Sequence, residues 1–97
     1  MFSITICDYK FTLPADGISA RVGEPVEFVA SSCDVTYGFG VFCKTGRMLF
    51  QMQVLPNYEN RIIWIFDEPG SYTIRSTEYS GPQHPFMVVP DAITVVP

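Results

Sequence analysis

Hydrophobic residues alternate with polar or small residues along most of the chain, with a period of two. Phe2, Ile4 and Ile6 show this pattern at the start, and it returns in several later stretches. A period of two places every second side chain on one face of an extended chain, so the pattern predicts β-strands. The expected strands cover 2–7, 18–22, 26–30, 48–55, 61–66, 72–75 and 93–96.

Two further stretches are less regular. Residues 9–13 continue the first strand after a kink, and 35–41 alternates although Gly38 and Gly40 interrupt it. The continuous Ile/Trp/Phe run at 61–66 predicts a strand that is buried on much of both faces.

Turn residues separate these stretches at strand-like intervals. Pro-Ala-Asp-Gly at 14–17, Lys-Thr-Gly at 44–46 and Asp-Glu-Pro-Gly at 67–70 are turn sequences. No long segment carries a helical apolar period without a proline or glycine. The chain of 97 residues is therefore expected to form one all-β domain over 1–97, an antiparallel sandwich or barrel of about seven to eight strands.

The amino-acid composition and the net charge argue against several classes of function. Hydrophobic residues make up 47% of the chain and charged residues 16%, which favours a folded core over disorder. The net charge of −4 argues against nucleic acid and against anionic membrane surfaces as partners. The sequence contains neither a membrane-spanning apolar run nor the apolar core of a signal peptide, so we expect it to be soluble as given.

The three cysteines are Cys7, Cys33 and Cys43. An odd number leaves at least one free thiol, and no two of the three have the spacing of zinc ligands. We expect them to be small, buried core residues, since free cysteine is among the most buried residue types.

Catalysis by the domain alone is not expected. His84 is the only histidine and lies between Gln83 and Pro85, without the Gly-x-Ser-x-Gly turn of a serine hydrolase or a glycine-rich phosphate loop nearby. The segment 76–87 does carry spaced side chains of the kind that bind metals, and it follows a predicted strand. The chemical question is therefore whether this segment holds a metal.

Several motifs resemble the extramembrane domain of subunit II of the heme-copper respiratory oxidases. Residues 34–39 read Asp-Val-Thr-Tyr-Gly-Phe, residues 69–72 read Pro-Gly-Ser-Tyr, and residues 22–26 read Val-Gly-Glu-Pro-Val. The family has similar motifs at the same spacing, and the resemblance runs from about Val22 to Met87. It implies a cupredoxin-like Greek-key β-sandwich or barrel and, in most members, a dinuclear copper centre called CuA.

The chain departs from the family at the copper ligands. Tyr37 stands where the family has its first histidine, and Ser76 and Ser80 stand where it has the two bridging cysteines. A serine hydroxyl is a hard ligand and a poor partner for Cu(I). The former CuA positions are Tyr37, Ser76, Glu78 (through its carbonyl), Ser80, His84 and Met87.

The loop also resembles that of quinol oxidases, whose subunit II reads Ser-x-x-Tyr-Ser-Gly-Pro here and binds no copper. This resemblance implies a structural, copper-free domain of a terminal oxidase, an oxidoreductase complex, with no cofactor of its own. It implies a membrane-embedded subunit I as partner and a redox protein as a second partner. The domain would lie on the periplasmic or extracellular face of an energy-transducing membrane, associated only through its partner or an anchor outside this sequence.

Two alternatives stay open. One is an electron-transfer cupredoxin with a weak mononuclear copper site made by His84, Met87 and Cys43. The other is a cupredoxin-like domain that serves a different partner, such as a copper chaperone. If copper has been lost, we expect the former pocket to hold a polar cluster of Tyr37, Ser76, Ser80 and His84.

Overall fold

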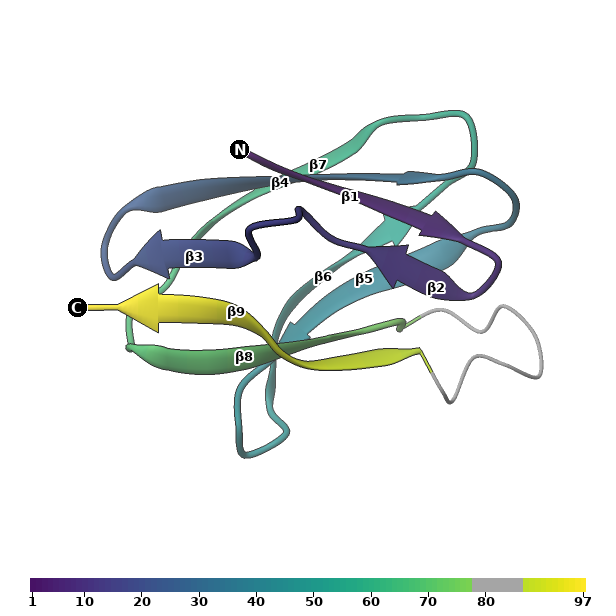
Figure 1. The fold of residues 1–97 in the computed structure, drawn as a ribbon. Coiled ribbons are helices and arrows are strands. Elements are labelled where there is room, and N and C mark those ends of the chain that lie inside the picture. Colours follow the sequence, from purple (N-terminus) through teal and green to yellow (C-terminus); the bar gives the residue numbers. More distant parts are fainter. Residues whose placement is uncertain (78–86) are drawn as a thin grey trace.

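The computed structural model describes residues 1–77 and 87–97, and these form a sandwich of two β-sheets (Figure 1). No helix long and apolar enough to cross a membrane occurs among them. The strands are β1 (Phe2–Cys7), β2 (Lys10–Thr12), β3 (Ile18–Arg21), β4 (Pro25–Ser32), β5 (Tyr37–Phe42), β6 (Met48–Val54), β7 (Asn60–Ile65), β8 (Gly70–Arg75) and β9 (Val88–Val96).

The first sheet has the strand order β2-β1-β4-β7 and the second has the order β3-β9-β8-β5-β6. The all-β class is confirmed. Two pairs, β1 with β4 and β3 with β9, are parallel, whereas we expected an antiparallel arrangement. Alternation reports only which face of a strand is buried and is the same for either direction of pairing, so it does not reveal these parallel pairs.

Nine strands form within the described residues, more than the seven to eight expected. One reason is that residues 9–13 do not continue β1. Asp8 and Tyr9 both adopt positive φ, 50° and 61°, in a two-residue turn between the paired residues Cys7 and Lys10. Positive φ at both central residues is the geometry of a tight hairpin, so the chain reverses there and β2 pairs back on β1.

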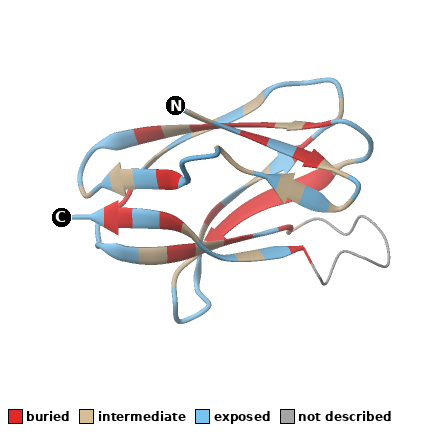
Figure 2. Cartoon of the chain, in the orientation of Figure 1, coloured by how far each residue is buried: buried red, intermediate tan, exposed pale blue. Residues whose placement is uncertain are grey.

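The core lies between the two sheets, where buried and exposed residues alternate along most strands (Figure 2). Phe28 of β4 is fully buried, and its ring centroid lies 5.5 Å from that of Phe39 and 5.7 Å from that of Phe50. Phe66 joins the same cluster, 6.4 Å from Phe50. These aromatic rings come from both sheets and hold the two layers together.

The expectation that residues 61–66 are buried on both faces is wrong. Burial alternates along β7, and Ile63 and Ile65 are 62% and 53% exposed. β7 is an edge strand of the four-stranded sheet, and among the described residues no second layer covers the outer face of that sheet. The inner face alone packs against the core, where Trp64 stacks on Phe50 with centroids 4.7 Å apart.

Gly40 on β5 allows the segment that leaves β8 to pack closely. A Cβ atom at Gly40 would lie 2.5 Å from Thr77 Cγ2 and 3.2 Å from the Arg75 carbonyl oxygen, too close for normal contact. We expect Gly40→Ala to lower the free energy of unfolding by about 1–3 kcal/mol, measured by urea denaturation. Because the Thr77 methyl group is the nearest atom, adding Thr77→Ser should restore part of that loss. A double variant no more stable than Gly40→Ala would contradict this packing argument.

Candidate functional site

Three of the six former copper positions lie in the described residues, and the structure brings them to one end of the sandwich. Tyr37 begins β5, Ser76 follows β8 and Met87 precedes β9. The Gly38 N–H donates a hydrogen bond to Ser76 Oγ over 3.2 Å, and the Ser76 N–H donates to the Met87 carbonyl oxygen over 3.1 Å. Neighbouring strands of one sheet thus place these three positions together.

All three side chains are buried. Tyr37 is 0%, Met87 3% and Ser76 5% exposed, and the Met87 side chain belongs to the hydrophobic core. The other three positions, Glu78, Ser80 and His84, lie outside the described residues. Ser80 and His84 are the contacts that would test the predicted polar cluster, so the cluster stays a prediction.

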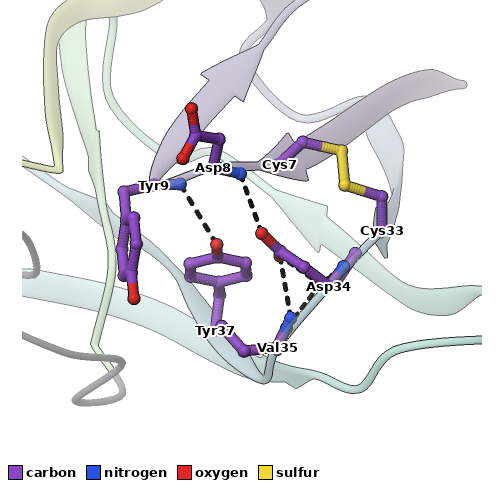
Figure 3. Close-up of a disulfide and its surroundings, with 8 residues drawn as sticks. Cys7, Asp8, Tyr9, Cys33, Asp34, Val35 and Tyr37 are labelled. Carbon is purple, nitrogen blue, oxygen red and sulfur yellow. Dashed lines mark hydrogen bonds between the residues drawn. A yellow bond between two sulfur atoms is a disulfide. The ribbon is translucent and has the colours of Figure 1, made fainter.

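The hydroxyl group of Tyr37 faces the β1–β2 hairpin (Figure 3). The Tyr9 N–H donates a hydrogen bond to Tyr37 Oη over 3.1 Å, and the Tyr9 and Tyr37 rings meet edge to face with centroids 6.0 Å apart. Burial raises the pKa of Tyr37 above its usual value, and its hydrogen bond to the negatively charged Asp34 raises that pKa further. The phenol is therefore neutral at physiological pH and is engaged in holding the hairpin.

Asp34 also binds the β1–β2 hairpin. Its carboxylate accepts hydrogen bonds from the Asp8 N–H at 2.9 Å and from the Val35 N–H at 2.8 Å. Desolvation raises the pKa of Asp34, but these hydrogen bonds outweigh it and hold the pKa below the ordinary value of 3.8. The charged form is thus the one that the fold stabilises.

A pH dependence follows from the lowered pKa of Asp34. Because the folded-state pKa lies below the unfolded value, the stabilisation is fully present above the unfolded pKa and is lost as the pH falls through the folded pKa. We expect the wild-type free energy of unfolding to fall between about pH 5 and about pH 3, and Asp34→Asn to fall less over that range. Urea titrations at several pH values measure both slopes. Equal slopes for the two proteins would show that Asp34 does not contribute.

The cysteines do not behave as buried core residues, so that expectation is wrong. Cys7 and Cys33 form a disulfide with a Cα–Cα distance of 5.4 Å, and Cys33 is exposed (Figure 3). Cys43 is the free thiol and is only partly buried. The disulfide joins the end of β1 to the loop that contains Asp34, a link that the spacing of the cysteines did not indicate.

Cys43 follows β5 at the end opposite to Tyr37. Six residues separate them, which corresponds to roughly 20 Å of extended strand. Hydrogen bonding to Thr45, whose Oγ1 lies 3.0 Å from Cys43 Sγ, lowers the pKa of Cys43 to about 7. The thiol borders a cavity of about 230 Å³ whose lining includes Arg47 and Tyr72. The structure therefore does not bring Cys43 together with Met87.

The described donor atoms do not fit a dinuclear copper centre. Such a centre needs soft thiolate bridges, whereas the described residues at this end of the sandwich offer the Tyr37 phenol, the Ser76 hydroxyl and the Met87 thioether, none of which is a thiolate. Tyr37 Oη is engaged by the Tyr9 N–H, and Ser76 Oγ is engaged by the Gly38 N–H. Within 1–77 and 87–97, no group of three or more His, Cys, Asp or Glu residues is arranged to hold a metal ion.

Comparisons with known proteins found similarity at the level of structure. No protein-family model and no curated protein sequence matches the chain. A heme-copper terminal oxidase solved as a dimer by cryo-electron microscopy has a chain similar to this one, with a TM-score of 0.72 and 20% identity. The match covers 96% of this chain and 62% of the oxidase chain, so this chain spans less than two thirds of that chain.

Two further solved structures are similar to this chain. The periplasmic domain of cytochrome oxidase subunit II from Bradyrhizobium japonicum has a TM-score of 0.67 and 18% identity, covering 98% of this chain and 83% of that one. A purple cupredoxin from Nitrosopumilus maritimus has a TM-score of 0.62 and 19% identity, covering 96% of this chain and 97% of that one. Similarity at such identities establishes the fold alone. The strand arrangement and these similarities together show that the chain has the cupredoxin fold, a Greek-key β-sandwich.

Proposed function

We propose that this chain is a copper-free domain of the subunit II type in a respiratory heme-copper oxidase, and that its role is structural. The proposal rests on the burial and the hydrogen bonds of two former ligand positions, Tyr37 and Ser76. Tyr37 and Ser76 are buried, and their oxygen atoms hold the β1–β2 hairpin and β5 in place. These two side chains stand at positions where a copper relay needs a histidine and a cysteine, and they make hydrogen bonds within the fold instead.

The type of oxidase follows from the missing relay. A copper centre in subunit II passes electrons from a soluble donor to the membrane subunit. A domain without thiolate bridges offers no such path, so the electrons would enter from quinol within the membrane. The partner is a membrane-embedded subunit I, which this domain covers on its outer side.

The extracytoplasmic location has two supports. One of the similar structures is a periplasmic domain of subunit II. Independently, the chain contains the Cys7–Cys33 disulfide, and disulfides persist mainly in oxidising compartments outside the cytoplasm. Both are consistent with a domain exposed on the periplasmic or extracellular face of the membrane.

Isolation of the protein from its native membranes with an affinity tag tests the proposal. We expect a heme-containing membrane subunit to co-purify and the complex to consume oxygen with a quinol donor, with no activity from reduced cytochrome c. Activity with a soluble cytochrome or cupredoxin donor would favour the electron-transfer alternative. Purification without any heme protein would favour a different partner and contradict the proposal.

A further inference from the structure

One covalent bond and two hydrogen bonds join the tip of the β1–β2 hairpin to the loop between β4 and β5 and to the first residue of β5. The covalent bond is the disulfide between Cys7, the last residue of β1, and Cys33. The hydrogen bonds run from the Asp8 N–H to Asp34 over 2.9 Å and from the Tyr9 N–H to Tyr37 Oη over 3.1 Å (Figure 3). Three consecutive residues, 7–9, are thus bonded to Cys33 and Asp34 of the loop and to Tyr37 at the start of β5.

The backbone of the tip depends on these outside contacts. Asp8 and Tyr9 have φ values of 50° and 61°, in the left-handed region that side chains with a Cβ atom rarely occupy. Aspartate is accepted at the first position of such a turn, but Tyr9 stands where glycine is usual. The turn therefore gains little from the local conformation of Tyr9. The tip is held on Tyr37 by the disulfide and the two hydrogen bonds, together with the packing of the half-buried Tyr9 and Phe11 against the core.

The tip shields the candidate site from solvent. Tyr37 is fully buried, and the Tyr9 ring stands beside it. The hairpin also forms one wall of a cavity of about 240 Å³ at this end of the sandwich, and the buried Met87 contributes to the opposite wall. The cavity is lined by Tyr9, Lys10, Phe11, Met87, Val88 and Val89. Displacing the tip would expose Tyr37 and widen this cavity.

The disulfide is within reach of an external reductant because Cys33 is exposed and Cys7 is only partly buried. We propose that the Cys7–Cys33 bond is a redox-controlled clamp that dithiol reductants open. The dithiol supplies two electrons and two protons, the sulfur–sulfur bond breaks into two thiols, and the reductant closes to its own disulfide. The hairpin tip then leaves Tyr37, while the rest of the sandwich stays folded. This inference does not depend on the proposed oxidase role or on the presence of copper.

Nitration of tyrosines tests the clamp on the full chain. Tyr37 and Tyr72 form a matched pair, because they are 0% and 5% exposed and burial raises the pKa of both. After reduction with dithiothreitol and alkylation of the thiols, we expect the nitration rate of Tyr37 to rise about tenfold or more, and that of Tyr72 to stay unchanged. Mass spectrometry of the peptides reads both rates. Nitration of both residues together would mean that reduction unfolds the domain, and unchanged nitration of Tyr37 would mean that no clamp exists.

Amide hydrogen exchange gives a second measurement. Reduction should speed exchange at Asp8 and Tyr9, whereas the Val22 N–H, bonded to the Val96 carbonyl oxygen at the other end of the sandwich, should keep its rate. A Cys43→Ser chain should respond as wild type does, which excludes the free thiol as the cause. The double variant Cys7→Ser, Cys33→Ser should show fast Tyr37 nitration without any reductant. If that variant does not fold, the reduced wild-type chain, with Tyr72 as its internal control, decides the question.

Discussion

Replacing Tyr37 by histidine and Ser76 and Ser80 by cysteine is expected to create a dinuclear copper site in this domain. The structure already brings residues 37, 76 and 87 to one end of the sandwich, with Gly38 bonded to Ser76 and Ser76 bonded to Met87. The two new thiolates supply the soft bridging ligands that the present chain lacks. Refolded with Cu(II), the triple variant should show intense thiolate-to-copper absorption, and we expect the unmodified domain to show no such band.

The copper experiment needs a chain without the free thiol Cys43 and a control variant that keeps Tyr37. Cys43 is a free thiol with a pKa of about 7, so the variants should carry Cys43→Ser as well, and any thiolate-to-copper band then comes from the new cysteines. The matched control contains both new cysteines but keeps Tyr37, and we expect it to give a weaker and different spectrum because one imidazole is missing. A triple variant without thiolate-to-copper absorption would contradict the assignment of Tyr37, Ser76 and Ser80 to the ligand positions.

Truncation of Phe28 is expected to cause the largest loss of stability among single core substitutions. Its ring is fully buried, it comes from the four-stranded sheet, and it contacts Phe39 and Phe50 of the five-stranded sheet. Phe28→Ala should lower the free energy of unfolding by about 3–5 kcal/mol, because the removed ring leaves a cavity between two sheets that cannot close on it. Urea denaturation followed by circular dichroism measures the loss.

Phe42→Ala is the matched control for that experiment. Phe42 is only partly buried, and its ring lies beneath the Arg75 guanidinium, 5.1 Å from centroid to Cζ. The same truncation at this position should cost about 1–2 kcal/mol, because the side chain is only partly buried and does not lie between the two sheets. Equal losses for the two variants would show that the Phe28 cluster does not join the two sheets as described.

Alternation and turn residues were enough to predict an all-β domain and most of its strands. They did not reveal that the Asp8–Tyr9 turn ends β1, because Tyr9 stands where a positive-φ hairpin usually has glycine. They also predicted burial on both faces of residues 61–66, whereas Ile63 and Ile65 face outward. Apolar residues on both faces of a strand do not specify that a second layer covers it.

The candidate site came from a resemblance of motifs rather than from periodicity. The structure brings three of the positions that this resemblance named, Tyr37, Ser76 and Met87, to one end of the sandwich, although they are far apart in the sequence. The resemblance did not indicate the Cys7–Cys33 disulfide or the role of Asp34, because both depend on how the β1–β2 hairpin lies on the next loop. Contacts between segments 26 residues apart are set by the tertiary fold and leave no local pattern in the sequence.

Copper analysis of the protein purified from copper-supplied cells tests the central claim most directly. Mass spectrometry of the metal content after treatment with a chelator, together with an electron paramagnetic resonance spectrum, measures whether the chain holds the metal. The account predicts no stoichiometric copper and no copper signal. One or two tightly held copper ions per chain would contradict it and would favour an electron-transfer cupredoxin instead.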